Sequence, residues 1–321
     1  QILEEGISEA GAMSSFTAAG MAYSTVGKPT IPFYIYYSMF GFQRVGDQIW
    51  CAADSRAKGF LLGATAGRTT LNGEGLQHQD GHSLLTATTV PNCISYDAAF
   101  AYEIGIIIKE GLRRMYENNE DLFYYLTLYN ENYPMPSIPK NSEEGIIKGI
   151  YKFKDVKKPQ IRLIGSGPIM QQVLHAENIL ADLGIKSEIW SATSFGGLRR
   201  DAIECERWNL LNPSKKQRIP YISKVIGKSE IITVAATDHI QAIPDMIESW
   251  IPGKYVTLGT DGFGRSDTRE NLRKFFEIDA DHIAAAAIST LMTEGQITKA
   301  KAESALKNLK INPDAPDPAR N

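Results

Sequence analysis

The sequence has few cysteines, no long hydrophobic run and no large excess of one charge. Its three cysteines, Cys51, Cys93 and Cys205, form no C-x-x-C pair. This argues against a disulfide framework or a zinc ribbon and favours the reducing cytoplasm. The longest apolar runs, at residues 104–108 and 283–288, are far shorter than the roughly 20 residues of a membrane helix. A net charge of −3 without a recurring basic cluster predicts neither nucleic acid nor membrane as a partner.

The length of 321 residues allows about two ordinary domains, and 43% hydrophobic residues are enough for their cores. Strand-like aliphatic runs alternate with segments of helical periodicity throughout the chain. This pattern predicts an α/β fold with two doubly wound parallel-sheet domains. Segment 130–144 has three prolines and little periodicity, which is typical of a linker. We therefore predict one domain at residues 1–135 and a second at residues 145–321.

Individual elements follow from local patterns. Apolar spacing from Ile7 to Tyr23 predicts an amphipathic helix, and the chain begins with Gln1 in a helix-like pattern. The run IPFYIYY at residues 31–37 predicts a buried strand that leads into a helix at residues 40–57. Further strands are predicted within segments 59–67, 89–96, 122–129, 160–167, 187–192, 230–236 and 255–261, and further helices within 98–116 and 169–184.

One polar segment, GRTTLNGEGLQHQDGH at residues 67–82, has only two leucines as aliphatic residues. A metal site would use Glu74, His78, Asp80 and His82, but their spacing does not match the helical H-E-x-x-H arrangement. A phosphate cradle would need a lysine, and the segment has none. Two interpretations remain open. The segment is either a solvated loop or a source of acid/base groups, Glu74 and His78, at the carboxyl end of a sheet.

Other motifs favour structural roles. The GSG at residues 165–167 lacks the third glycine of G-x-G-x-x-G and predicts a tight turn between a strand and a helix. No G-x-S-x-G nucleophile elbow occurs. The stretch TDGFGRSDTREN at residues 260–271 precedes a helix, for which Ser266 or Asp267 is the predicted N-cap.

Several longer motifs resemble one enzyme family. They are ISEAG at residues 7–11, YIYYSMFGFQR at 34–44 and the polar segment 67–82, with CERWN at 205–209 and GTDGFGRSD at 259–267 further along. Together they resemble the thiamine-diphosphate-dependent decarboxylating component of the pyruvate dehydrogenase complex, in its single-chain, homodimeric bacterial form. The resemblance implies oxidative decarboxylation of pyruvate, reductive acetylation of the lipoyl group of dihydrolipoyl acetyltransferase, and a homodimer.

The resemblance also assigns cofactor-binding residues. Glu9 matches the glutamate that hydrogen-bonds a ring nitrogen of the aminopyrimidine, and in an apolar site it would keep a proton to share. Tyr37 and Phe40 match the aromatic residues that flank that ring. Arg44 would meet the cofactor or a carboxylate, or form a structural salt bridge. By pattern alone, Glu9 is an ordinary first-turn helix acid and the two aromatic residues belong to a core.

The polar segment receives a role on the same basis. Glu74 and His78 match residues on the substrate side of the thiazolium ring, where they would hold the substrate and handle protons. Asp80 and His82 are expected to shape the loop. Because the glycines give the backbone freedom and little aliphatic surface anchors it, we expect this loop to be poorly ordered in the absence of cofactor and substrate.

Part of the family pattern is absent. No Gly-Asp-Gly triplet occurs, and Asn118-Asn119 has no such triplet upstream, although the family binds diphosphate and magnesium through these groups. We therefore expect the carboxyl-terminal part of a longer polypeptide, with an incomplete pyrimidine-binding domain. Alone, this part should be inactive and bind thiamine diphosphate and magnesium weakly or not at all.

The second half resembles the transketolase-type C-terminal domain. It is expected to contribute dimer packing and the entrance of the active site, and no catalytic residue is predicted in it. Two alternatives stay open. A transketolase-like enzyme would need basic residues for a sugar phosphate, and the polar segment offers only Arg68. A non-catalytic binding subunit is the other alternative.

Overall fold

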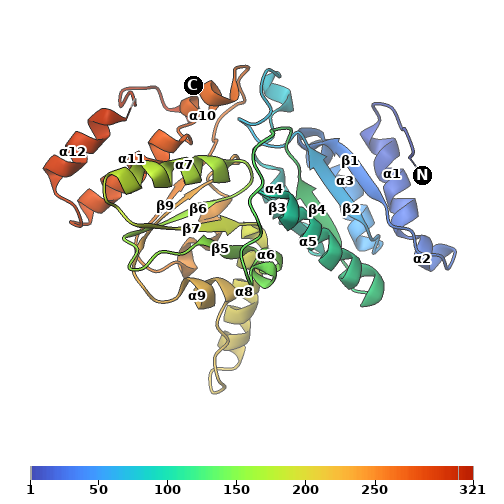
Figure 1. Cartoon of the computed structure of the whole chain (residues 1–321). Coiled ribbons are helices and arrows are strands. Elements are labelled where there is room, and N and C mark those ends of the chain that lie inside the picture. The colour runs from blue at the N-terminus through green and yellow to red at the C-terminus, as the bar shows by residue number, and fades with distance from the viewer. Residues whose placement is uncertain (1, 310, 321) are drawn as a thin grey trace.

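The computed structural model describes residues 2–309 and 311–320 and contains two sheets that lie side by side (Figure 1). The elements of the first half are α1 (Glu9–Gly20), α2 (Ala22–Thr25), β1 (Phe33–Tyr37), α3 (Gly41–Asp54), β2 (Phe60–Ala64), α4 (Ser83–Ala87), β3 (Cys93–Asp97), α5 (Ala101–Leu112) and β4 (Phe123–Thr127). Those of the second half are α6 (Glu143–Lys148), β5 (Ile150–Lys154), β6 (Ile161–Gly165), α7 (Ile169–Asp182), β7 (Ser187–Ala192), α8 (Phe195–Leu211), α9 (Tyr221–Ile226), β8 (Ile232–Ala236), β9 (Tyr255–Leu258), α10 (Arg269–Phe275), α11 (Ala280–Thr293) and α12 (Lys299–Asn308).

The first sheet has the strand order β1-β2-β4-β3, and each neighbouring pair is parallel. Parallel neighbours require crossover connections, which α3, α4 and α5 provide. The second sheet has the order β5-β7-β6-β8-β9. The predicted α/β fold with parallel sheets is therefore confirmed. One strand differs from the prediction, because β5 was not expected and pairs with β7 in the antiparallel direction.

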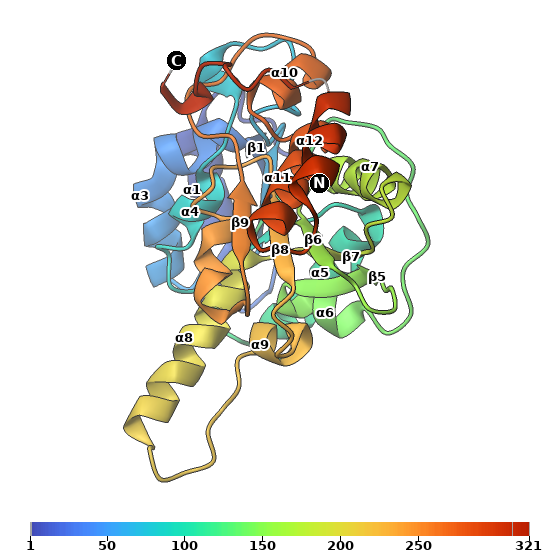
Figure 2. The ribbon, with the colours of Figure 1, turned by 90° about the vertical axis from the view of Figure 1, so that its left-hand side faces the viewer.

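The two sheets are joined by residues 128–142, which contain no helix or strand. Buried hydrophobic side chains from both halves of the chain pack together. One cluster extends from Phe60 and Tyr124 in the first sheet to Ile150 and Trp190 in the second. Within the described residues, no helix combines the length and the apolar character needed to cross a membrane. Figure 2 shows that α8 and the loop after it extend away from both sheets.

The amino-terminal elements differ from the sequence expectation in two ways. Residues 2–7 are not helical, and α1 begins at Glu9 with Ser8 as its N-cap; Gln1 lies outside the described residues. The predicted buried strand at residues 31–37 is β1, but one of its faces is open. Phe33, Ile35 and Tyr37 are 46%, 63% and 41% exposed. Because β1 is the edge strand of its sheet, an apolar run there does not require burial on both faces.

Two turn predictions had different outcomes. The GSG motif forms the tight turn between β6 and α7, and Gly167 has a positive φ of 49°. The N-cap of α10 is neither Ser266 nor Asp267. Thr268 occupies that position, and its side chain accepts a hydrogen bond from the Asn271 amide. Ser266 and Asp267 instead contact residues 73 and 74, as described below.

The carboxyl ends of the two sheets face each other. The amide of Gly167, just after β6, donates to the carbonyl of Asp97 at the end of β3 over 3.4 Å. The amide of Arg68, after β2, donates to the carbonyl of Asp238, after β8, over 3.1 Å. Loops at the carboxyl ends of parallel strands are where α/β proteins usually bind ligands. In this chain, two such sets of loops meet.

Candidate functional site

The predicted site residues come from three segments that meet beside the carboxyl end of β1. Glu9 is the first residue of α1, Tyr37 ends β1, and the polar segment 67–82 follows β2. Arg44 lies in the first turns of α3, directly after β1. The crossover geometry of the parallel sheet therefore brings together residues that are far apart in the sequence.

Glu9 and Arg44 form an ion pair. Arg44 Nη1 donates to Glu9 Oε1 over 2.9 Å, and the Glu9 side chain is 18% exposed. Tyr34 also contacts Glu9, because its hydroxyl donates to the Glu9 backbone carbonyl over 3.4 Å. Burial, together with the carboxylates of Glu9 and Glu5, raises the pKa of Tyr34 to about 12. The sequence analysis expected an apolar environment for Glu9. This expectation is wrong, because the Glu9 carboxylate is paired with the Arg44 cation.

Three rings continue the site from this ion pair. The Arg44 guanidinium carbon lies 3.9 Å from the centre of the Phe40 ring, within the range of a cation–π contact. The Phe40 and His78 rings are 5.2 Å apart, edge to face. Tyr37 lies 5.5 Å from His78 and 5.8 Å from Phe40. Tyr37 is 41% exposed. Its interpretation as a buried core residue is therefore wrong.

His78 and Glu74 complete the cluster. His78 Nδ1 lies 3.6 Å from Glu74 Oε2, and the two side chains are 28% and 38% exposed. This separation is too long for a hydrogen bond, and Nδ1 has no hydrogen-bond partner among the described residues. All six predicted residues, Glu9, Tyr37, Phe40, Arg44, Glu74 and His78, are thus connected through neighbouring contacts.

Asp80 shapes the loop from inside, as expected. It is fully buried, and its carboxylate accepts hydrogen bonds from the hydroxyls of Ser38 and Ser83 and from the amides of His82 and Ser83. Burial by itself would raise the pKa of Asp80. The nearby His239 and the hydrogen bonds outweigh it and hold this pKa below its ordinary value. Burial lowers the pKa of His82, although Asp80 opposes that change.

The metal and solvated-loop interpretations disagree with this geometry. The Asp80 carboxylate already accepts four hydrogen bonds, from Ser38, His82 and Ser83. Among the described residues, no three His, Cys, Asp or Glu side chains group closely enough to hold a metal ion. The loop is also not simply solvated, because Thr69, Thr70, Gln79 and Asp80 are fully buried. Its position is determined by polar contacts, which the sequence argument about aliphatic anchoring overlooked.

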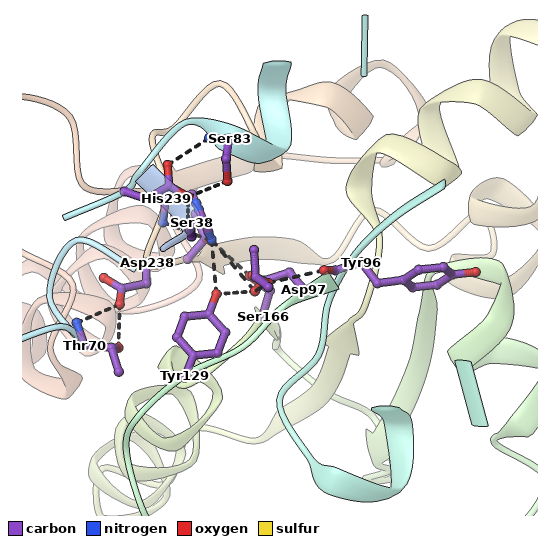
Figure 3. Close-up of polar contacts among 12 residues, drawn as sticks. Ser38, Thr70, Ser83, Tyr96, Asp97, Tyr129, Ser166, Asp238 and His239 are labelled. Carbon is purple, nitrogen blue, oxygen red and sulfur yellow. Dashed lines mark hydrogen bonds and ion pairs between the residues drawn. The ribbon is translucent and has the colours of Figure 1, made fainter. Parts of the chain in front are cut away.

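The second half supplies many of these contacts. Asp238, after β8, is fully buried, and its carboxylate accepts from the amides and hydroxyls of Thr69 and Thr70, as Figure 3 shows in part. Burial raises the pKa of Asp238, and Arg273 and the threonine hydrogen bonds oppose that change. Arg68 Nη1 donates to the carbonyls of Thr260, over 3.0 Å, and Gly262. Arg68 is 5% exposed, so it is committed to the contact between the halves.

A second polar group lies next to Asp238. The buried His239 ring approaches the Tyr129 hydroxyl at 3.1 Å and Asp97 Oδ1 at 3.8 Å (Figure 3). Thr127 also donates to Asp97 Oδ1, over 2.7 Å. The sequence analysis named no residue of the second half for the site. The sequence signal that could have identified such a residue is the dipeptide Asp238-His239, which begins two residues after the end of β8, where parallel sheets bind ligands.

Solved structures show a similar arrangement of the chain. A transketolase from Leishmania mexicana superposes with a TM-score of 0.67 at 17% identity, over 97% of this chain and 38% of that chain. A split-gene transketolase, described as an inactive beta4 tetramer, superposes with a TM-score of 0.61 at 19% identity, over 95% of this chain and 84% of that chain. At these identities the likeness concerns the fold alone.

Family models and curated relatives are more specific. Residues 1–136 match the model of the pyruvate dehydrogenase E1 component middle domain, and residues 149–279 match the transketolase-like C-terminal domain. The pyruvate dehydrogenase E1 components of Pseudomonas aeruginosa and Escherichia coli K12 are each 51% identical over 99% of this chain. The chain spans 37% and 36% of the lengths of these two relatives. The chain therefore belongs to the pyruvate dehydrogenase E1 component family, of which it contains the middle domain and the transketolase-like C-terminal domain.

Proposed function

We propose that the chain is part of an enzyme that decarboxylates pyruvate with thiamine diphosphate and acetylates the lipoyl group of dihydrolipoyl acetyltransferase. The observation that supports this best is the continuous set of contacts from Glu9 to Glu74, since it joins three separate segments at one sheet edge. We also propose that residues 1–135 and 145–321 act as two domains within a homodimer. A cytoplasmic location remains a prediction from the scattered thiols.

The site residues fit one end of the cofactor. Glu9 offers a partly exposed carboxylate, and Tyr37 and Phe40 offer flat apolar rings beside it. When bound, thiamine diphosphate supplies a nucleophilic carbon and accepts the electrons left by departing carbon dioxide. Its magnesium would need several oxygen ligands, and the described residues contain no such metal group. We propose that this chain holds the aminopyrimidine and that other residues of the enzyme hold the diphosphate.

Each residue of the cluster then has a distinct task. The Glu9 carboxylate would form a hydrogen bond with a ring nitrogen of the aminopyrimidine, and Arg44 fixes the direction of that carboxylate through their 2.9 Å contact. The rings of Tyr37 and Phe40 exclude water and restrict the orientation of a flat ligand. His78 is the proposed proton donor or acceptor toward the substrate, and the Glu74 carboxylate lies 3.6 Å from its Nδ1 atom.

Two other functions were considered from the sequence, and the geometry favours neither. A transketolase-like enzyme that uses Arg68 for a sugar phosphate would need this guanidinium at the surface, whereas it is buried against Thr260 and Gly262. A non-catalytic binding subunit would not need Glu74 and His78 beside exposed aromatic rings. The following experiment distinguishes these two functions from the proposed one.

The test uses the complete enzyme that carries these residues, loaded with thiamine diphosphate and magnesium. We expect release of carbon dioxide from pyruvate and no consumption of ketose phosphates. His78→Ala should lower kcat by about a hundredfold or more, whereas His175→Ala, at an exposed position on α7, should retain it. Ketose-phosphate turnover would support the transketolase alternative. Absence of both activities would support a binding subunit.

A further inference from the structure

We propose that the second half of the chain positions the segment that carries Glu74 and His78. In this proposal Asp238 holds the start of the segment and residues 264–267 hold its middle, so that Asp238 and its partner Thr69 are positioning residues for His78. The proposal rests on the proposed function, because it assigns these contacts to the alignment of an acid/base group.

The first attachment is the Asp238 carboxylate. Its Oδ1 accepts from the Thr69 amide at 2.9 Å and the Thr69 hydroxyl at 2.7 Å. Its Oδ2 accepts from the Thr70 amide at 3.0 Å and the Thr70 hydroxyl at 2.5 Å. An ionised carboxylate has about four lone-pair sites, so this group is fully used by two consecutive residues. The two anchored residues cannot rotate without breaking several hydrogen bonds at once.

The approach of Asp238 also depends on the backbone beside it. A side-chain Cβ at Gly67 would lie only 2.2 Å from Asp238 Oδ2, and the φ of Gly67 is +88°. Only glycine is compatible with both conditions. The glycine that seemed to give the segment freedom therefore permits its close attachment to the second half.

The second attachment lies around Glu74 and His78. The Gly73 amide donates to the Asp267 carbonyl over 3.2 Å, and the Ser266 hydroxyl donates to the Glu74 carbonyl. The buried Gln79 side chain accepts from the Arg265 amide at 2.6 Å. These contacts flank the two acid/base side chains on both sides in the sequence. The sequence analysis predicted Ser266 or Asp267 as a helix N-cap, whereas their stretch at residues 264–267 holds this segment in place.

The arrangement leaves the reactive groups accessible while their backbone is held. The side chains of Glu74 and His78 are 38% and 28% exposed, whereas Thr69, Gln79 and Asp238 are fully buried. A glycine-rich segment would otherwise have a high conformational entropy. Catalytic groups act efficiently only when they are held close to their reacting geometry, and a misplacement of about 1 Å can reduce the rate about a hundredfold.

The test compares Thr69→Val with Thr69→Ser in the complete enzyme. The valine has nearly the shape of threonine but lacks the hydroxyl that donates to Asp238, and the serine retains that hydroxyl. We expect Thr69→Val to lower kcat about tenfold to a hundredfold, with the KM for pyruvate nearly unchanged, and Thr69→Ser to stay near wild type. Amide hydrogen exchange in residues 73–79 should become faster in the valine variant only. A decrease in thermal stability with unchanged kcat would overturn the proposal.

A second variant keeps the proposal testable if the buried Thr69→Val substitution disturbs folding. Ser266→Ala removes the hydroxyl that donates to the Glu74 carbonyl at an exposed position, where the fold tolerates the change. Faster exchange in residues 73–79 with a severalfold lower kcat is expected. Unchanged exchange in both Ser266→Ala and Thr69→Val would overturn the proposal whatever the activity.

The proposed function can fail separately. If the wild-type enzyme does not consume pyruvate, or if His78→Ala retains full turnover, the assigned reaction or the role of His78 is wrong. Hydrogen exchange still reports on the contacts of Asp238 in that case. Normal exchange in the valine variant, together with inactivation by His78→Ala, would refute only the positioning proposal.

Discussion

Arg44 binds Glu9 directly, with its Nη1 atom 2.9 Å from the Glu9 carboxylate. The same guanidinium lies over the Phe40 ring, 3.9 Å from its centre. Arg44 therefore forms the salt bridge that the sequence analysis considered, and its partner is the residue expected to serve the cofactor. The same Arg44 guanidinium thus contacts both the Glu9 carboxylate and the Phe40 ring, and it fixes how the two are oriented relative to each other.

Replacing Glu9 tests that carboxyl. Glu9→Gln keeps the shape but removes the acid, so kcat of the complete enzyme at saturating cofactor should fall about a hundredfold to ten-thousandfold. Glu5→Gln is a matched control, because Glu5 is a nearby exposed acid that accepts from Ser15 and lies outside the cluster. Steady-state kinetics of both variants checks this. Wild-type turnover in Glu9→Gln would eliminate Glu9 from the mechanism.

Cofactor binding by this chain alone should be weak. The aminopyrimidine contacts involve neutral or partly exposed groups, whereas the charged diphosphate and its magnesium need oxygen ligands that the described residues do not group together. Calorimetric titration with thiamine diphosphate and magnesium measures this, with the complete enzyme as control. Micromolar affinity of the separate chain would contradict the proposed division of the binding site.

Asp80 should stabilise the protein in a pH-dependent way. The folded pKa of Asp80 lies below its ordinary value, so the ionised form is favoured by folding. Its contribution is complete above the unfolded pKa of about 3.9 and is lost as the pH falls through the lower folded pKa. At pH 7, Asp80→Asn should reduce the free energy of unfolding by about 1 to 3 kcal/mol.

The measurement is urea unfolding of wild type and Asp80→Asn between pH 7 and the acid range. The difference between the two proteins should be constant near neutral pH and shrink below about pH 4. A difference that grows with acidification would show that the sign assigned to Asp80 is wrong.

Two stacked phenylalanines provide a comparison of core and edge. Phe33 and Phe60 lie 4.7 Å apart on neighbouring strands, but Phe60 is fully buried and Phe33 is 46% exposed. Phe60→Ala should reduce the free energy of unfolding by about 3 to 5 kcal/mol, because it leaves a cavity. Phe33→Ala should cost less than about half as much, since less apolar surface is lost. Equal losses in urea unfolding would show that Phe33 is covered in solution.

The sequence determined most of the secondary structure, and its motifs predicted which residues form the candidate site. Aliphatic runs separated by helical patterns placed β6 to β9 and the main helices, because hydrophobic periodicity is a local property. Glu9, Tyr37, Phe40 and His78 were predicted as site residues because the motifs that contain them are long and resemble those of the enzyme family. The sequence did not predict which side chains of β1 are exposed to solvent. Nothing in the run IPFYIYY tells whether its strand is central or lies at an edge.

Only the tertiary structure decided what surrounds these residues. Asp238 meets Thr69 across 169 positions of the sequence, and no local pattern predicts such a pairing. It arises because the carboxyl ends of two parallel sheets face each other, so that polar residues after β2 and β8 satisfy one another away from water. For the same reason the polar segment, which seemed to lack anchors, is held by hydrogen bonds rather than by aliphatic packing.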